Sequence, residues 1–80
     1  MRSVDEPTEV EVRIADDGGV TPIAFVWDRR RMPISDWGRT RTEGTRRFYM
    51  VMVDARQAFE LCYDSAERRW RVTQAPDTAA

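Results

Sequence analysis

The chain's chemistry depends on arginine and carboxylate side chains. Its 80 residues include thirteen arginines, no lysine and no histidine. Without histidine no side chain has an ordinary pKa near neutrality, and without lysine there is no amine for a Schiff base. Arginine stays protonated and replaces neither, but its forked guanidinium group binds carboxylates and phosphates. The composition therefore points away from an enzyme and towards a binding function.

The single cysteine, Cys62, has neither a histidine nor a second cysteine with which to share a metal ion. A common four-ligand zinc site is therefore excluded within one chain, and we expect no metal and no cofactor. A lone cysteine forms no intramolecular disulfide, which favours a reducing compartment. No apolar run reaches the length of a signal peptide core or a membrane span, so we expect a cytoplasmic protein without a membrane partner.

Two residues of one predicted strand are the strongest candidates for catalysis. A buried Glu60 with a raised pKa would be a general acid, but Arg71 is expected on the same face of the next strand. We therefore favour a cross-strand ion pair between Glu60 and Arg71. Cys62 is interpreted as a small buried hydrophobic residue rather than a nucleophile. The sequence thus predicts no catalytic residue.

Arginines cluster beside aromatic residues in three segments between Trp27 and Tyr49. Guanidinium groups bind phosphate in a bidentate manner, and an exposed aromatic ring stacks on an unpaired base. Trp37 is out of phase with its strand and next to a polar stretch, so we expect it at the surface. The predicted nucleic-acid-binding residues are Arg29, Arg30, Arg31, Trp37, Arg39, Arg41, Arg46 and Arg47.

Charge is distributed unevenly, although the net charge is only −1. Residues 1–19 contain six acids and two arginines, whereas residues 28–71 contain eleven arginines and seven acids. This pattern predicts an acidic arm beside a moderately basic body. The arginine excess has a second explanation, a GC-rich genome, and composition alone does not separate the two.

Short alternating and apolar segments predict an all-β fold. No segment shows a 3.6-residue period over the length of a helix, and glycine, proline and aspartate punctuate the apolar runs. We expect a single-domain antiparallel meander of five to six short strands, forming a curved sheet or a small barrel. The domain is expected at residues 9–74, with a disordered lead-in at 1–8 and a frayed tail at 75–80. Residues 38–45 are polar and predict an exposed loop.

The clearest hairpin joins residues 48–53 and 58–63. If Val53 pairs with Ala58, one face is core, and its members are Phe48, Met50, Met52, Phe59, Leu61 and Tyr63. The opposite face then contains Tyr49 and Val51, and it is also mostly apolar. We therefore expect a partner or a second element to cover Tyr49 and Val51, which makes them a candidate interaction face.

Three segments together resemble a known family: Phe25–Trp27, the pair Asp36 and Trp37, and Phe59–Asp64 followed by Trp70–Val72. They are similar to small bacterial domains of unknown function that are often encoded beside a Y-family translesion DNA polymerase. The resemblance spans residues 22–73. In this chain Asp28 and Arg29 replace the Arg-Gly of the family's usual turn. The resemblance implies a DNA-damage context and supplies no catalytic residue.

Two functional hypotheses follow. The first is a non-catalytic accessory module that contacts nucleic acid or a DNA-repair protein such as a DNA polymerase. The alternative is a protein-binding or self-associating module without a nucleic-acid role, for which a homodimer through Tyr49 and Val51 is the simplest form.

Overall fold

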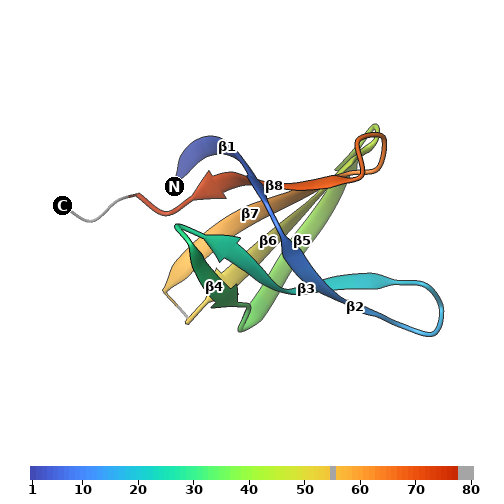
Figure 1. Cartoon of the computed structure of the whole chain (residues 1–80), viewed down its shortest axis with the longest axis horizontal. Coiled ribbons are helices and arrows are strands. Elements are labelled where there is room, and N and C mark those ends of the chain that lie inside the picture. The colour runs from blue at the N-terminus through green and yellow to red at the C-terminus, as the bar shows by residue number, and fades with distance from the viewer. Residues whose placement is uncertain (55, 78–80) are drawn as a thin grey trace.

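The computed structural model describes residues 1–54 and 56–77, which form eight antiparallel strands (Figure 1). Their bounds are β1 Arg2–Thr8, β2 Val10–Ile14, β3 Val20–Trp27, β4 Arg30–Pro33, β5 Asp36–Glu43, β6 Arg46–Val53, β7 Gln57–Asp64 and β8 Arg69–Ala75. Within these residues no helix is long and apolar enough to cross a membrane. The all-β prediction is confirmed, with more strands than the five to six expected.

The strands form two open sheets. The larger sheet has the order β1-β8-β7-β6-β5, and the smaller has the order β2-β3-β4. Among the described strands neither sheet closes on itself, so the expected small barrel is not present. The chain passes from the larger sheet to the smaller at Glu9, and the Thr8 hydroxyl bonds the backbone oxygen of Val26, 2.6 Å away. This contact ties β1 to β3 across the two sheets.

Phe25 and Phe59 connect the sheets in the centre of the core. Their rings meet edge to face with 5.0 Å between centroids, and Trp27 packs against Phe59 at 5.7 Å. Leu61 and Val72 of the larger sheet complete this fully buried centre. Burial of each large side chain contributes about 1.5–3 kcal/mol to folding, so these few residues provide much of the stability of a small domain.

The first residues form a strand, and the expectation of a disordered lead-in at residues 1–8 is wrong. β1 pairs with β8 from Arg2 opposite Ala75 to Thr8 opposite Trp70. Val4 is the only aliphatic side chain of β1, and it packs against the core. A strand with one apolar anchor gives no alternating pattern, which explains the incorrect prediction. At the other end β8 includes the buried Ala75, and residues 78–80 of the expected tail lie outside the described part.

The β6–β7 hairpin is present as expected, but its register differs by one residue. Val53 pairs with Gln57 rather than Ala58, and Val51 pairs with Phe59. A shift of one residue moves every side chain to the opposite face of the sheet. Tyr49 and Val51 therefore join Phe59 and Leu61 in the core, while the other face contains Phe48, Met50, Met52, Glu60 and Cys62.

The polar segment expected as a loop at residues 38–45 belongs mainly to a strand. β5 pairs with β6 along the edge of the larger sheet, with an irregularity between Trp37 and Thr40. Every residue of β5 is exposed, so it lacks the alternation of apolar residues by which strands are recognised. Charged residues along such an edge also discourage pairing with other chains.

Candidate functional site

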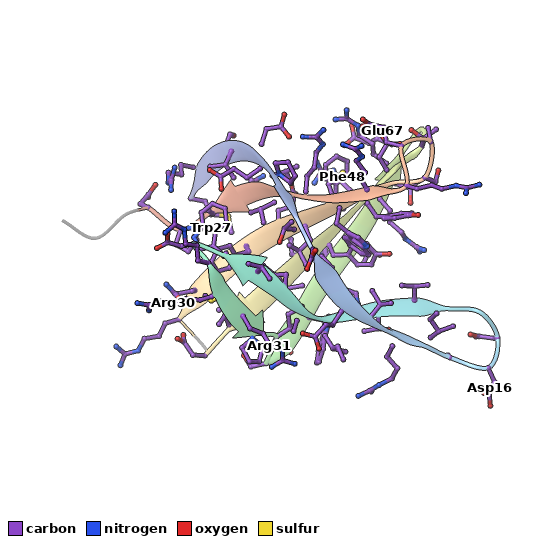
Figure 2. All side chains as sticks on the ribbon, viewed as in Figure 1. Asp16, Trp27, Arg30, Arg31, Phe48 and Glu67 are labelled. Carbon is purple, nitrogen blue, oxygen red and sulfur yellow. The ribbon has the colours of Figure 1, made fainter. Side chains whose placement is uncertain are left out.

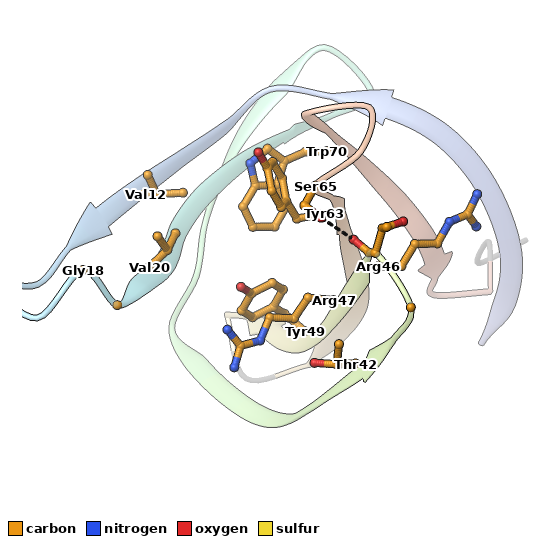
Figure 3. Close-up of a pocket in the computed structure, with 13 residues that line it drawn as sticks. Val12, Gly18, Val20, Thr42, Arg46, Arg47, Tyr49, Tyr63, Ser65 and Trp70 are labelled. Carbon is orange, nitrogen blue, oxygen red and sulfur yellow. Dashed lines mark hydrogen bonds between the residues drawn. The ribbon is translucent and has the colours of Figure 1, made fainter.

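A groove opens between the β2–β3 hairpin and the inner face of the larger sheet (Figure 3). It consists of two adjoining cavities of about 530 Å³ and about 440 Å³. The cavities share Gly19, Val20, Arg47 and Tyr49 in their walls. We call this surface the aromatic groove and define it by Val12, Val20, Trp37, Arg47, Tyr49, Tyr63 and Trp70.

The register of the larger sheet aligns one wall of the aromatic groove. Arg47 on β6 lies opposite Tyr63 on β7, which in turn lies opposite Trp70 on β8. The ring of Trp70 lies 5.0 Å from that of Tyr63 and 5.4 Å from that of Tyr49, measured between centroids. Trp70 and Tyr63 are only half-buried, so part of this ring cluster faces the groove. An aromatic surface of this kind accepts a flat apolar group by stacking.

The opposite wall is the apolar side of the β2–β3 hairpin. Val12 and Val20 line the larger cavity, and the hairpin extends past the edge of the two sheets (Figure 1). Ile14 pairs with Val20 near the end of this hairpin and is 68% exposed. The apolar side of the hairpin therefore extends beyond the hydrophobic core into solvent. Exposed apolar surface of this kind is a feature of interaction sites.

Arg47 brings positive charge into the aromatic groove. Its guanidinium carbon lies 5.9 Å from the centre of the Tyr49 ring, and its side chain extends along that ring in Figure 3. Arg47 forms no ion pair with any residue in the described part of the chain. An exposed cation beside aromatic rings is suited to an anionic ligand that also carries a flat group.

Trp37 lies at the second cavity and is 46% exposed, as the sequence predicts. Its indole N–H donates a hydrogen bond of 2.7 Å to the Pro22 carbonyl oxygen. Trp37 belongs to the larger sheet and Pro22 to the smaller, so this bond holds the ring between the two sheets. Trp37 also contributes to the wall of the smaller cavity.

The other predicted arginines do not gather at the aromatic groove. Arg29 and Arg30 lie at the β3–β4 turn, and Figure 2 shows Arg30 and Arg31 far from Asp16 at the tip of the β2–β3 hairpin. Arg31 is paired with Glu11 through a bond of 2.6 Å. Arg29, Arg30 and Arg31 therefore lie outside the walls of the aromatic groove.

Arg39 and Arg41 line a separate cavity on the outer face of the larger sheet. Arg46 contributes to the wall of the larger groove cavity, but its guanidinium group pairs with Asp64 at 3.3 Å. Of the eight predicted nucleic-acid-binding residues, only Trp37, Arg46 and Arg47 therefore border the groove.

The outer face carries a polar cluster around Glu60, whose side chain is only 3% exposed. One carboxylate oxygen accepts a 2.8 Å bond from Arg41, and the other accepts a 2.8 Å bond from the Thr73 hydroxyl. The predicted pair of Glu60 with Arg71 is wrong, because Arg71 lies opposite Cys62 and pairs with Asp5. Glu60 is thus fully engaged as a structural group.

Two further groups on the outer face have shifted pKa values. Burial raises the pKa of the Cys62 thiol, which keeps it protonated and unreactive. Burial alone would raise the pKa of Asp64, but hydrogen bonds from the Thr45 hydroxyl, two backbone N–H groups and Arg46 outweigh it and lower the value. Asp64 therefore stabilises the β7–β8 turn as a carboxylate.

The proposed interaction face at Tyr49 and Val51 needs correction. Tyr49 is 7% exposed and Val51 is 1% exposed, because the smaller sheet covers this side of β6. Val51 is unavailable to a partner, and only the edge of Tyr49 reaches the aromatic groove. Sequence reasoning instead assigned Tyr63 and Trp70 wholly to the core. Their proximity to Arg47 follows from the corrected register, which the sequence did not reveal.

No group of three or more potential metal ligands occurs among residues 1–54 and 56–77. Comparisons of the chain with protein-family models, with curated proteins and with solved structures find no match.

Proposed function

We propose that this protein is a non-catalytic binding module that holds a single-stranded segment of nucleic acid in the aromatic groove. The observation that carries the proposal is the position of Arg47. It is free of ion pairs with the described residues and projects beside an aromatic cluster. A nucleotide matches this arrangement, because its phosphate can pair with Arg47 and its base can stack on the rings of Tyr63 and Trp70.

A single strand fits this groove better than a duplex. The aromatic surface lies between a hairpin and a sheet, where a ligand must offer the flat face of a base. A duplex hides its base faces in its own stack and presents its phosphates outside. The only groove arginine without a carboxylate partner in the described residues is Arg47, so stacking rather than charge is expected to supply most of the affinity.

The wider setting of this proposal comes from the sequence. The resemblance to domains encoded beside translesion polymerases makes a displaced or damaged DNA strand a suitable ligand. We place this role in the cytoplasm, and we assign the module no catalytic step. A DNA polymerase that holds the same strand is the protein partner that such a module would serve.

A second candidate function rests on the exposed apolar part of the hairpin. Val20 lines the groove, and its pairing partner Ile14 is largely exposed, so an apolar protein segment or a second copy of the chain would cover this surface. The two candidate functions differ in how strongly binding depends on the positive charge of Arg47. Neutralising Arg47 would weaken nucleic-acid binding strongly and apolar protein binding little.

The test is fluorescence anisotropy with a labelled single strand of ten thymidines at low salt. The wild-type protein should bind it more tightly than a duplex of equal length, with affinity falling as salt increases. Arg47→Gln should weaken binding about tenfold or more and reduce the log–log salt slope by about 0.7.

Arg56→Gln is the matched control, because Arg56 is an exposed arginine at the opposite end of β6 from Arg47. It should leave affinity nearly unchanged. Equal losses in the two variants would show that only total charge matters. Absence of binding by the wild type at micromolar concentration, together with a dimer in sedimentation, would select the protein-binding function.

A further inference from the structure

We infer that the aromatic groove contains a second base subsite at Trp37, so that it recognises two neighbouring bases with their joining phosphate at Arg47. The inference rests on the proposed function and specifies its smallest complete ligand. That ligand is a dinucleotide step of a single strand rather than an isolated nucleotide.

The division of the groove into two cavities is the first argument. Tyr63 and Trp70 line only the larger cavity, and Trp37 lines only the smaller, whereas Arg47 and Tyr49 line both. A ligand that occupies both cavities must therefore pass Arg47. One flat group at each end and an anion between them match the order of base, phosphate and base in a single strand.

Tyr63 of the larger-cavity subsite lies opposite Arg47 on β6. Trp37 lies opposite Val51 on β6, four residues from Arg47. At about 3.3 Å per residue, the two positions are about 13 Å apart along the strand. The Arg47 guanidinium lies over Tyr49, between these positions. Tyr49 also packs on Trp70, so the guanidinium group lies beside the larger-cavity subsite, on the side of Arg47 from which β6 continues towards Val51 and Trp37.

The attachment of Trp37 is the second argument. Trp37 is 46% exposed, although its indole N–H is bonded to Pro22. The hydrogen bond fixes the ring and leaves surface facing the smaller cavity. A ring held in place before binding loses little conformational entropy when a base stacks on it.

Asp17 determines which part of the ligand occupies the smaller cavity. This carboxylate lines that cavity and accepts the Gly19 N–H at 2.8 Å. A phosphate beside Asp17 would be repelled, whereas a neutral base would not. The acidic side of the smaller cavity therefore favours a base at Trp37 and directs the phosphate to Arg47.

The test is competition against the labelled strand of ten thymidines with thymidine monophosphate and with the dinucleotide TpT. TpT carries less negative charge than the monophosphate, so any tighter binding reflects the second base. In the wild type TpT should bind about 5- to 150-fold more tightly than the monophosphate. Trp37→Ala should reduce this ratio to about one, while Trp37→Phe, which keeps a ring, should retain most of it.

Thermal melts of both Trp37 variants show whether they remain folded, and the ratio compares two ligands on the same protein. A ratio near one in the wild type, or an unchanged ratio in Trp37→Ala, overturns the second subsite while the proposed function stands. Failure of the wild type to bind the ten-nucleotide strand overturns the proposed function and the subsite with it.

Discussion

At the scale of single residues, the three tryptophans have three different roles. Trp27 packs edge to face on Phe59 in the core, Trp70 joins the core to the groove, and Trp37 spans the two sheets from an exposed position. Sequence periodicity identified Trp37 as exposed. It did not identify Trp70 as a residue with one side in the core and one side in the groove.

This difference predicts unequal costs of truncation. Trp70→Ala removes contacts with Tyr49 and Tyr63 and should lower the free energy of unfolding by about 3 kcal/mol. Trp37→Ala loses mainly one hydrogen bond and should lower it by about 1 kcal/mol. Urea unfolding of both variants measures the difference. Equal destabilisation would show that Trp37 is a core residue and would remove the stacking role proposed for it.

Asp64 predicts an acid-sensitive part of the stability. Its pKa in the folded protein lies below the ordinary value of 3.8. The stabilisation from the ionised group is therefore complete above pH 3.8 and is lost as the pH falls through the lower folded value. Asp64→Asn keeps an oxygen for the backbone N–H groups of Ala66 and Glu67 but has no charge to titrate.

The urea midpoint of the wild type should fall more steeply than that of Asp64→Asn between about pH 5 and pH 2. Parallel curves would mean that Asp64 has the same pKa in the folded and unfolded states.

At the scale of elements, β1 is the strand that the sequence pattern did not predict. It covers the edge of β8 and places Val4 on the core, and Thr8 contacts Val26 of the smaller sheet. Deletion of residues 1–8 should therefore abolish cooperative unfolding or lower the melting temperature by more than about 10 °C. Circular dichroism measures this change. If the truncated protein melted at the wild-type temperature, residues 1–8 would contribute nothing to stability, as expected of a disordered lead-in.

Strands with an apolar run or regular alternation were predictable. β2, β3 and the β6–β7 hairpin show such patterns, and the structure contains all of them. β1 and β5 have few inward apolar residues, so no pattern distinguished them from loops. The register of the β6–β7 hairpin could not be fixed either, because both faces of β6 are apolar and the wrong pairing also gives a plausible core.

The residues of the candidate site were predictable from the sequence only in part, for the same reasons. Arg47 and Trp37 were predicted to bind nucleic acid from their chemistry, and both line the aromatic groove. Tyr63 and Trp70 were missed because their faces depend on the register. The ion pairs of Arg31 and Arg41 could not be predicted from the sequence either, because their partners Glu11 and Glu60 lie on other strands.

At the scale of the whole molecule, the net charge and the aromatic groove together determine how the proposed ligand would bind. The net charge is −1, and ion pairs across strands join carboxylates to Arg31, Arg41, Arg46 and Arg71. A net charge so close to zero gives little long-range attraction for a polyanion such as nucleic acid. Under the proposed function, binding depends on the aromatic rings of the groove and on Arg47, which has no ion pair with the residues that the structure describes, so we predict modest affinity and a shallow dependence on salt.

The central claim is that a single strand occupies the aromatic groove, and the indole N–H signals of the three tryptophans test it directly. A two-dimensional ¹H–¹⁵N NMR spectrum is recorded while a single strand of ten thymidines is added. The signals of Trp70 and Trp37 should shift with increasing ligand, while that of Trp27, which lines other cavities, should remain in place. A spectrum in which no signal moves, or in which Trp27 moves most, would contradict the account.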